Sequence, residues 1–474
     1  MRCPGPCATA LLALAFAWPG DQPGICRAAE TPVKGRPNVI VLLVDDMGWK
    51  DFSCQGSGFY RTPHIDRLAA SGVRFTSGYA ACTVCSPSRA SMLTGQYPAR
   101  LHITDWIPGH DRPFAKLTIP AWQKQLPLEV VTVAERLKAT GYATASIGKW
   151  HLGGDEFGPT HQGFDENVGG THRGQPPSYF SPYKIPTLAD GPAGEYLTDR
   201  EAAEAVRFIE QHRDQPFFLY LPHHCVHTPI QAKPDVAAKY ESHVRNGDGK
   251  NAAYAAMVES VDDSVGRILD ALDAVGIRDR TAIFFTSDNG GLVNMTDNTP
   301  LRAGKGSAYE AGVRVPFLVS WPGVTQAGAT NSVPVITPDI PATILDLSGV
   351  GPEPTQPLDG VSLAAALRGG GLPRDALYWH YPHYHPGGAT PHSAIRAGDF
   401  RLLHFYEDGR NELYDLRTDP GETTDLAAAD PARTLALKAR LDAGLADVGG
   451  QMPTANAAFD PVRDGKPARE KRKR

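Results

Sequence analysis

The stretch Asn38-Val39-Ile40-Val41-Leu42-Leu43-Val44-Asp45-Asp46-Met47-Gly48 decides the fold. After Asn38 it runs through six apolar residues without alternation, which is typical of a strand buried on both faces of a parallel sheet. Residues 216–221 and 281–286 repeat this pattern, and polar residues follow each run. Ligands bind at the carboxyl ends of strands in open α/β sheets, so we expect these trailing polar residues to meet in one crevice.

Helix-like periodicity appears between the predicted strands, at residues 62–71, 131–139, 199–212, 254–275 and 338–347. Strands that alternate with helices predict an α/β architecture. The long loops at 109–126 and 170–192 are candidates for the rim of a functional site, because loops of this length in a compact domain tend to be functional.

The length of the chain and a change in its residue pattern near residue 370 predict two domains. With 474 residues, the chain exceeds the size at which one core usually stops growing. We predict a large domain at residues 36–370. Short strand-like pieces and a helix near 431–447 then predict a small α+β domain at 371–450. Apolar residues make up 41% of the chain and the formal net charge is -5, so no global field favours nucleic acid.

The two ends of the chain carry their own signals. Residues 1–29 read as a secretory signal peptide, which predicts a secreted or periplasmic protein. A membrane anchor is the alternative, but the apolar run is shorter than the roughly 20 residues that span a bilayer, so no stable membrane insertion is expected. Residues 460–474 are predicted to be a basic, disordered tail.

The cysteines form no obvious framework. Of seven, three would leave with the signal peptide, and Cys54, Cys82, Cys85 and Cys225 would remain. Their spacing matches no zinc site. Small buried hydrophobes are the expected role for most of them, although their pairing is left open.

Two polar pairs after predicted strands suggest a metal site. Asp45-Asp46 and Asp288-Asn289 supply three carboxylates and an amide oxygen. These hard oxygen ligands suit Ca²⁺ or Mg²⁺ better than zinc. Each pair alone is more often a turn, so other motifs must support the interpretation.

The run from Cys85 to Gly95, Cys-Ser-Pro-Ser-Arg-Ala-Ser-Met-Leu-Thr-Gly, carries the most functional information. A cysteine followed by proline two residues later and by arginine four residues later resembles the maturation signal of type I sulfatases. In that family a maturation enzyme oxidises the cysteine to Cα-formylglycine (3-oxoalanine). The resemblance implies an aldehyde hydrate as nucleophile, which attacks sulfur with one hydroxyl and expels sulfate by deprotonating the other.

Further segments resemble the same family, at residues 148–153, 227–229, 305–306 and 312–316. The resemblance covers about residues 36–450. It implies one Ca²⁺ per chain, held by Asp45, Asp46, Asp288, Asn289 and the modified Cys85. It also implies the alkaline-phosphatase-like fold: a large mixed sheet between helices, plus a C-terminal domain with a four-stranded antiparallel sheet.

The resemblance implies catalytic roles as well. Lys149 and Lys305 would clamp the sulfate oxygens with the metal, and Arg89 would hold the hydrate. An aspartate beside the metal, Asp288, would help to activate the attacking hydroxyl. His227, with Lys305, would protonate the departing oxygen, and His151 would accept the second hydroxyl's proton.

The substrate subsite is predicted from histidines that lie outside these motifs. We expect His383 and His385, with His172, to line the leaving-group side, where imidazoles can donate hydrogen bonds to sugar hydroxyls. A plain connecting loop is the alternative. His223 and His224 lack such a context and are interpreted as loop structure.

The predicted activity is hydrolysis of sulfate monoesters. The enzyme is expected to act at the chain ends of a sulfated carbohydrate and also to accept aryl sulfates. A phosphonate monoester or phosphodiester hydrolase of the same fold is the main alternative. A catalytically silent carbohydrate-binding protein is a second alternative. A cysteine hydrolase is disfavoured, because the carboxylates of Asp45, Asp46 and Asp288 would oppose a thiolate.

Overall fold

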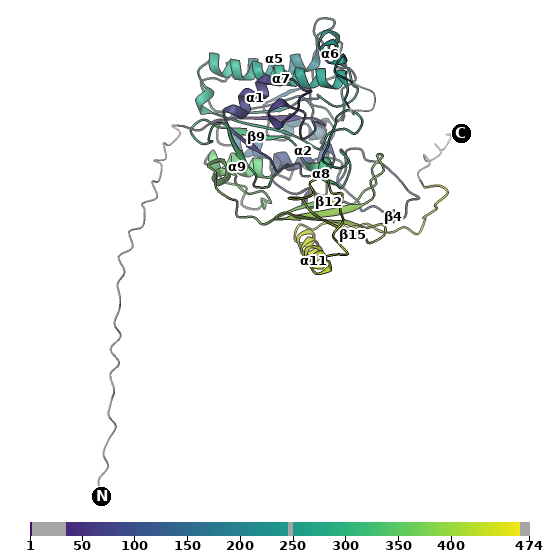
Figure 1. Ribbon diagram of the computed structural model, residues 1–474. Coiled ribbons are helices and arrows are strands. Elements are labelled where there is room, and N and C mark those ends of the chain that lie inside the picture. Colours follow the sequence, from purple (N-terminus) through teal and green to yellow (C-terminus); the bar gives the residue numbers. More distant parts are fainter. Residues whose placement is uncertain (2–34, 245–249, 465–474) are drawn as a thin grey trace.

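The structure, a computed structural model, describes Met1 and residues 35–244 and 250–464 (Figure 1). Apart from Met1, the predicted signal peptide lies outside the described residues. Among the described residues, no helix combines the length and the apolar character that crossing a bilayer requires.

An eight-stranded sheet forms the centre of the large domain, in the order β10-β2-β9-β8-β1-β7-β5-β6. Its middle strands are β8 (Thr281–Ser287), β1 (Asn38–Val44) and β7 (Phe217–Pro222), which pair in parallel. The three apolar runs of the sequence are therefore neighbours, an order that the sequence did not predict. The remaining strands are β2 (Val73–Phe75), β5 (Ala143–Ile147), β6 (Glu166–Val168), β9 (Phe317–Ser320) and β10 (Ala329–Asn331).

The sheet is mixed because β9 runs antiparallel to both β8 and β2. Strand direction could not be derived from the apolar pattern, since a buried antiparallel strand reads in the same way.

Helices cover both faces of the sheet (Figure 1). Ile40, Leu42 and Val44 of β1 pack with the helices of one face, and the alternate residues of β1 pack with those of the other. The first face carries α1 (Pro63–Ala70), α5 (Leu197–Gln211) and α7 (Ala252–Ala274), with α6 (Pro234–Glu241) against α7. The second carries α2 (Cys85–Thr94), α4 (Val133–Lys138), α9 (Asp339–Leu347) and α10 (Ala364–Leu367).

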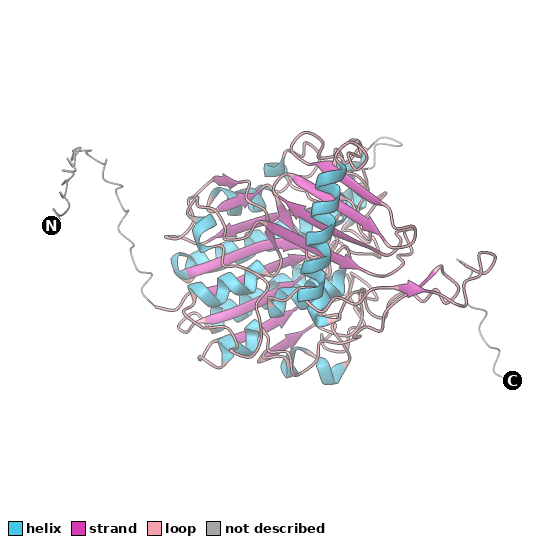
Figure 2. Ribbon diagram, turned by 90° about the horizontal axis from the view of Figure 1, so that it is seen from below, coloured by secondary structure: helices cyan, strands magenta, loops and turns pink. Residues whose placement is uncertain are grey.

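The C-terminal region is a four-stranded antiparallel sheet with one helix (Figure 2). Its order is β12-β13-β14-β15, and α11 packs on its outer side. The elements are β12 (Ala376–Tyr381), β13 (His392–Ala397), β14 (Phe400–Phe405), β15 (Asn411–Asp415) and α11 (Pro431–Asp447). Together the two sheets confirm the alkaline-phosphatase-like architecture.

Short elements complete the described chain. They are β3 (Gly78–Tyr79) with β11 (Val335–Ile336), α3 (Pro98–Leu101), α8 (Glu310–Val313), and β4 (Leu117–Thr118) with β16 (Thr454–Ala455). Single turns of 3₁₀-helix lie at Ser53–Gln55, Asp155–Phe157, Pro159–His161 and Arg278–Arg280.

The predicted tail needs a correction. Residues 460–464 form turns, and the amide of Asp460 donates a hydrogen bond to the carbonyl of Phe114 at 3.2 Å. The strand pair β4–β16 anchors this segment, which extends from the body in Figure 2. The prediction of disorder was wrong for these five residues because that long-range pairing is invisible in a local pattern.

Candidate active site

Cys85 is the first residue of α2, and its side chain lies at the wall of a pocket of about 360 Å³. Val84 before it is extended, and Gly95, at φ 72°, ends the helix. The segment is almost wholly buried. Its position places residue 85 at the helix N-terminus, where the backbone dipole favours negative charge.

His151 contacts Cys85 directly, since its Nδ1 lies 3.4 Å from Sγ. Its Nε2 lies 2.5 Å from the carbonyl oxygen of Ile107. A carbonyl only accepts, so Nε2 carries the proton and a neutral ring presents Nδ1 to residue 85 as an acceptor. Burial, followed by the charge of Lys149, lowers the pKa of His151 well below its usual value, which favours this neutral form.

The backbone of His151 is held in the left-handed region, at φ 62°. Its amide donates to the carbonyl of Thr171 at 3.0 Å, and its carbonyl accepts from the hydroxyl of Ser86 at 3.0 Å. Side-chain-bearing residues adopt this conformation at a cost, usually where the surroundings fix it for a function.

The carboxylates stand where the parallel strands end, as the sequence predicts. Asp45 and Asp46 follow β1, and Asp288 and Asn289 follow β8. Asn289 donates from Nδ2 to Oδ1 of Asp46 at 2.8 Å, and the amide of Asp46 lies 3.3 Å from Oδ1 of Asp288. The four side chains are buried.

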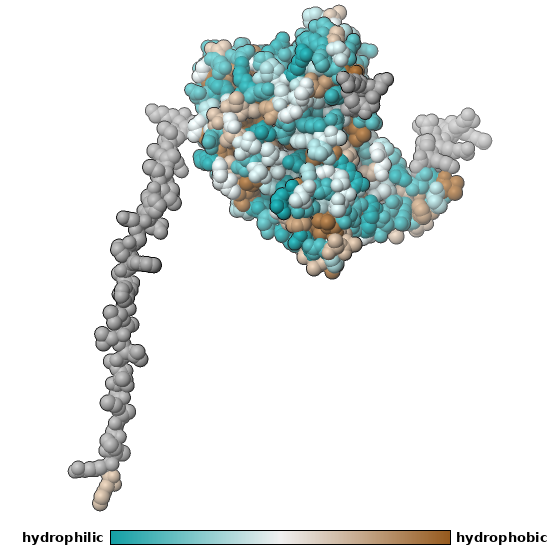
Figure 3. Space-filling model, in the orientation of Figure 1, coloured by the Kyte–Doolittle hydropathy of each residue, from teal (hydrophilic) through white to brown (hydrophobic). Residues whose placement is uncertain are grey.

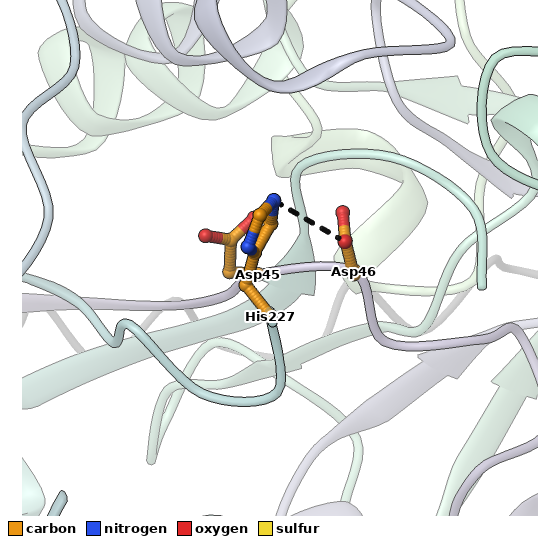
Figure 4. A group of neighbouring side chains, drawn as sticks. All are labelled: Asp45, Asp46 and His227. Atoms are coloured by element: carbon orange, nitrogen blue, oxygen red, sulfur yellow. Dashed lines mark ion pairs between the residues drawn. The ribbon is translucent and has the colours of Figure 1, made fainter. Parts of the chain in front are cut away.

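These residues fit a divalent cation with hard oxygen ligands. Among the described residues, Oδ1 of Asp45 and Oδ1 of Asn289 are buried oxygens without a hydrogen-bond donor. Buried acceptors of this kind are costly unless a cation or donor meets them. Asp45, Asp46 and His227 also place ligand atoms within 4.8 Å of one another (Figure 4).

Three cations surround the carboxylates. Lys149 donates to Oδ2 of Asp45 at 2.6 Å, and Lys305 contacts Oδ1 and Oδ2 of Asp46 at 2.6 and 2.9 Å. Arg89 donates from Nε to Oδ2 of Asp288 at 2.9 Å, and its Nη2 lies 2.8 Å from the same oxygen in an ion pair. Both lysines thus reach a carboxylate, but only Lys305 lines the pocket, and Lys149 is fully buried.

The charges set the protonation of the site. Burial raises the pKa of Asp45, and repulsion from Asp288 adds to it. Burial acts in the same direction on Asp46, but Lys305 and His227 outweigh it and lower the pKa of Asp46 below its usual range. Burial opposes the charge on Lys305, yet Asp46 raises the pKa of Lys305 above its usual value, so Lys305 remains an ammonium.

His227 lines the same pocket as His151. Its Nε2 is 3.7 Å from Oδ2 of Asp46, as the dashed line in Figure 4 marks. Its Nδ1 lies 2.9 Å from the carbonyl of Thr228, so Nδ1 carries the proton of the neutral ring. Burial and Lys305 lower the pKa of His227 to about 3, so in this charge balance Lys305, rather than His227, holds the available proton.

Burial also raises the pKa of the Cys85 thiol, although Lys149 and Lys305 oppose this effect. An unmodified Cys85 is therefore a protonated thiol and a weak nucleophile. A weak nucleophile at this position argues against a cysteine hydrolase, which the sequence also disfavours. Cys54, Cys82 and Cys225 are also unpaired, and only Cys54 is partly exposed.

The pocket brings six of the predicted residues together. It is lined by Asp46, Cys85, His151, His227, Lys305 and His385, with Trp106, Ile107, Pro108, Gly174, Gln175, Thr228, Leu292 and Pro386. Gly174 and Gln175 come from the loop at 170–192, which was expected at the rim.

Two of the predicted subsite histidines lie elsewhere. His383 is fully buried, with Nε2 2.8 Å from the hydroxyl of Thr104, and it does not line the pocket. His172 is exposed and is likewise absent from the lining. Of the three, only His385 lines the pocket. Both His383 and His385 follow the end of β12 at Tyr381, in a segment without regular structure, so their spacing in the sequence could not predict which of them would reach the pocket.

His223 and His224 have a structural role in the described chain. Both Nδ1 atoms lie beside the buried carboxylate of Glu201, at 2.7 and 2.6 Å. Neither lines the pocket, in agreement with their interpretation as loop structure.

Sequence reasoning missed the neutral part of the pocket. Trp106, Leu292 and Thr228 line it, and the carbonyl of Ile107 fixes the tautomer of His151. Thr228 lies in the family-like segment 227–229, but no motif marks Trp106, Ile107 or Leu292, since each acts through its place in the folded chain.

A mixed sheet with helices on both faces, and an oxygen-rich site at the ends of its central strands, defines a hydrolase of the alkaline-phosphatase-like class. The sulfatase family profile matches residues 37–350, and that of the C-terminal region of N-sulphoglucosamine sulphohydrolase matches residues 304–448.

Known proteins agree with these matches. The chain is 33% identical to human arylsulfatase A, over 88% of this chain and 90% of that one. It is 34% identical to human N-acetylgalactosamine-6-sulfatase, over 73% and 68%. A crystal structure of Ps i-CgsB in complex with k-i-k-neocarrahexaose superimposes with a TM-score of 0.75, at 30% identity, over 90% and 96%. The chain belongs to the sulfatase family and is an enzyme that hydrolyses sulfate esters.

Proposed function

We propose that this enzyme removes sulfate from the end of a sulfated carbohydrate, outside the cytoplasm, by using a formylglycine at position 85 and a bound Ca²⁺. The contact between Cys85 Sγ and His151 Nδ1, 3.4 Å long and at the wall of the pocket, carries this proposal. A carbohydrate is supported by the sugar-directed names of two of the similar proteins.

Two groups that the family implies would supply part of the chemistry. A formylglycine would supply a hydrated aldehyde as the attacking group, and Ca²⁺ would neutralise sulfate charge and polarise its oxygens. The oxygens of Asp45, Asp46, Asp288 and Asn289 would hold the cation. Cys85 Sγ occupies the place where the formylglycine oxygens would lie.

The chain's own residues would bind and orient the sulfate. Lys305 presents its ammonium group to the pocket, where Asp46 fixes it, and the ammonium group of the buried Lys149 is fixed by Asp45. Such donors are effective because folding, rather than substrate binding, orders them. Arg89 holds Asp288 in place and does not reach the pocket lining.

Two groups would move protons. The Nδ1 lone pair of His151 is positioned to accept a proton from the group at residue 85. On the other side, Lys305 and His227 face the space where the leaving oxygen would emerge, with Lys305 as the protonated partner. The contact of His151 with residue 85 and the retained charge of Lys305 separate the roles of base and acid.

A substrate panel tests this proposal. Purified enzyme that carries the modified residue would be assayed with 4-nitrophenyl sulfate, with sulfated mono- and oligosaccharides, and with a phenylphosphonate monoester. We expect sulfate release from the aryl and sugar substrates, and none from a Cys85→Ala variant. A higher kcat/KM for the phosphonate ester than for every sulfate ester would instead favour the phosphonate monoester or phosphodiester hydrolase.

The end-directed action has its own readout. Release of sulfate from chain ends leaves the interior sulfates of a long polysaccharide intact until the chain is shortened. Early sulfate release in proportion to the number of ends is expected. Release in proportion to total sulfate would contradict end-directed action.

A further inference from the structure

A second pocket of about 340 Å³ adjoins the reaction pocket and shares His385 and Pro386 with it. Its volume falls in the range of roughly 300–1,000 Å³ that is usual for small-molecule sites. The other lining residues come from two distant segments, 110–114 and 463–464, together with Gly388. The His385-Pro386 pair is therefore the partition between two neighbouring spaces.

Ordered backbone far along the chain forms part of the wall of this second pocket. Residues 454–464, which we call the C-terminal arm, attach to the loop after residue 110 through β16 and β4. Asn456 donates from Nδ2 to the carbonyls of Ala115 and Pro113, at 2.7 and 3.0 Å. The amide of Asp460 donates to the carbonyl of Phe114. These hydrogen bonds hold the C-terminal arm in place, so that Arg463 and Asp464 lie in the pocket wall.

Arg112 is a fixed part of that wall. Its guanidinium lies 4.4 Å from the ring centroid of Tyr384, and its Nη2 and Nε donate to Oδ1 of Asp464 at 2.6 and 3.1 Å. A stacked arginine in such an ion pair keeps its remaining donors in a defined direction.

Arg463 is different, because its donors are available. Its guanidinium lies 3.4 Å from the ring centroid of Phe114, while Nε is 3.9 Å from Oδ2 of Asp460, too long for a hydrogen bond. Within the described chain no hydrogen bond holds this guanidinium, and 58% of the side chain is exposed. It can donate to a ligand without breaking an existing bond.

The chemistry of the lining selects the class of ligand. Two guanidinium groups, of Arg112 and Arg463, face two carboxylates, of Asp111 and Asp464, so their charges balance. A small bare anion would gain little from such a wall. A ring with several hydroxyls finds donors and acceptors together. A sugar unit has this character.

We propose that the second pocket binds the sugar unit next to the sulfated one, so that the substrate is a saccharide chain that crosses the His385-Pro386 partition. This inference rests on the proposed function and adds that specificity depends on the C-terminal arm. Arg463 is then a specificity-determining residue that contacts the neighbouring unit and takes no part in the chemistry.

The test compares short and long probes on Arg463→Ala. The probes are 4-nitrophenyl sulfate, which fills only the reaction pocket, and sulfated mono-, di- and tetrasaccharides prepared from carrageenan and from chondroitin sulfate. For wild type, kcat/KM is expected to rise from mono- to disaccharide in one series. In Arg463→Ala it should fall about tenfold for the longer probes, mainly through KM, which corresponds to one lost hydrogen bond to a charged group.

A matched control is Arg433→Ala, since Arg433 also lies over a phenylalanine, 3.7 Å from the ring centroid of Phe400, but on α11. It should leave every probe within twofold. Asp464→Asn, which keeps the shape of the wall, provides a second variant and should also lower only the long-probe values.

Three results would overturn the inference. One is a wild type that gains nothing from a second sugar unit, and another is an Arg463→Ala loss that is equal for all probes. The third is an Arg463→Ala variant without any loss. In each of these cases turnover of 4-nitrophenyl sulfate still supports the proposed function. Inactivity of the formylglycine-bearing wild type on every probe would remove the proposed function and the inference together.

Discussion

At the scale of the residue, hydrogen bonds to backbone carbonyls decide what each histidine can do. The Nε2–H of His151 donates a hydrogen bond to the carbonyl of Ile107, and its Nδ1 lone pair faces residue 85. The Nδ1–H of His227 donates a hydrogen bond to the carbonyl of Thr228. Each ring keeps one lone pair, that of His151 beside residue 85 and that of His227 beside Asp46, so their neighbours distinguish the two side chains. The geometry assigns proton acceptance to His151.

Replacement of His151 by alanine tests that assignment. We expect kcat to fall by about 10²–10⁴-fold, the usual contribution of a positioned general base, with KM changed little. Steady-state kinetics with 4-nitrophenyl sulfate measures both values. An unchanged kcat would contradict the role of His151.

The pH dependence follows from the same residue. The pKa of His151 lies well below its usual value, because of burial and then Lys149. A base acts in its deprotonated form, so activity is retained above this pKa and lost as the pH falls through it. We expect the acidic limb of the kcat profile to lie below about pH 6.5. An acidic limb above pH 7 would show that another group controls it.

Metal removal tests the buried oxygens of Asp45 and Asn289. A chelator should abolish turnover, and Ca²⁺ should restore it. Ca²⁺ should also raise Tm as its concentration increases, because a ligand that binds only the folded state stabilises it. An Asp45→Asn variant should need more Ca²⁺ for both effects. Full activity after verified metal removal would disprove the metal site.

At the scale of the element, the strand pattern was more informative than the loops, of which only the length of 170–192 indicated a place at the reaction pocket. The three apolar runs predicted the central strands β8, β1 and β7, because burial on both faces leaves a continuous apolar signature. The same logic predicted the carboxylates of the site, which directly follow two of these strands. The pocket's neutral lining and the C-terminal arm depend on long-range contacts, which no local pattern encodes.

Gly148, between β5 and Lys149, shows how an element positions a catalytic side chain. Its φ is 116°, and an added Cβ would lie 2.1 Å from the carbonyl oxygen of Pro222. That same carbonyl accepts the amide hydrogen of Lys149 at 2.7 Å. Only glycine fits this close approach of two backbones.

The Gly148→Ala variant should therefore lose both stability and activity. The strain exceeds the roughly 1 kcal/mol that is usual at positive φ, since backbone atoms must move and Lys149 moves with them. Thermal unfolding and kcat/KM are the measurements. Gly141→Ala is the control, at φ 90° with nothing within 4 Å of the added Cβ. Equal losses in both variants would show that the contact with Pro222 is unimportant.

At the scale of the whole molecule, a buried charge network joins the two sheets. Arg401 of β14 contacts Glu422 at 2.7 Å and Glu310 of α8 at 3.4 Å, and it donates to the carbonyl of Ala308. All three charged side chains are buried. The loop from Lys305 to α8 is thus held from the C-terminal region.

Arg401→Met should destabilise the protein by about 3–5 kcal/mol, the usual effect of leaving buried charge without its partner. Urea unfolding followed by fluorescence measures the free energy of unfolding. Arg417→Met, at a side chain that is 70% exposed, is the control and should change little. A small effect of Arg401→Met would mean that the network does not couple the two regions.

The identity of residue 85 is the central claim for the whole enzyme, and mass spectrometry of the peptide that contains it is the most direct measurement. The protein would be purified after export from a host that modifies such motifs, and the same sample would be assayed for aryl sulfate turnover. The account predicts the mass of formylglycine at position 85, in proportion to the specific activity. A fully active sample in which residue 85 retains the mass of cysteine would contradict it.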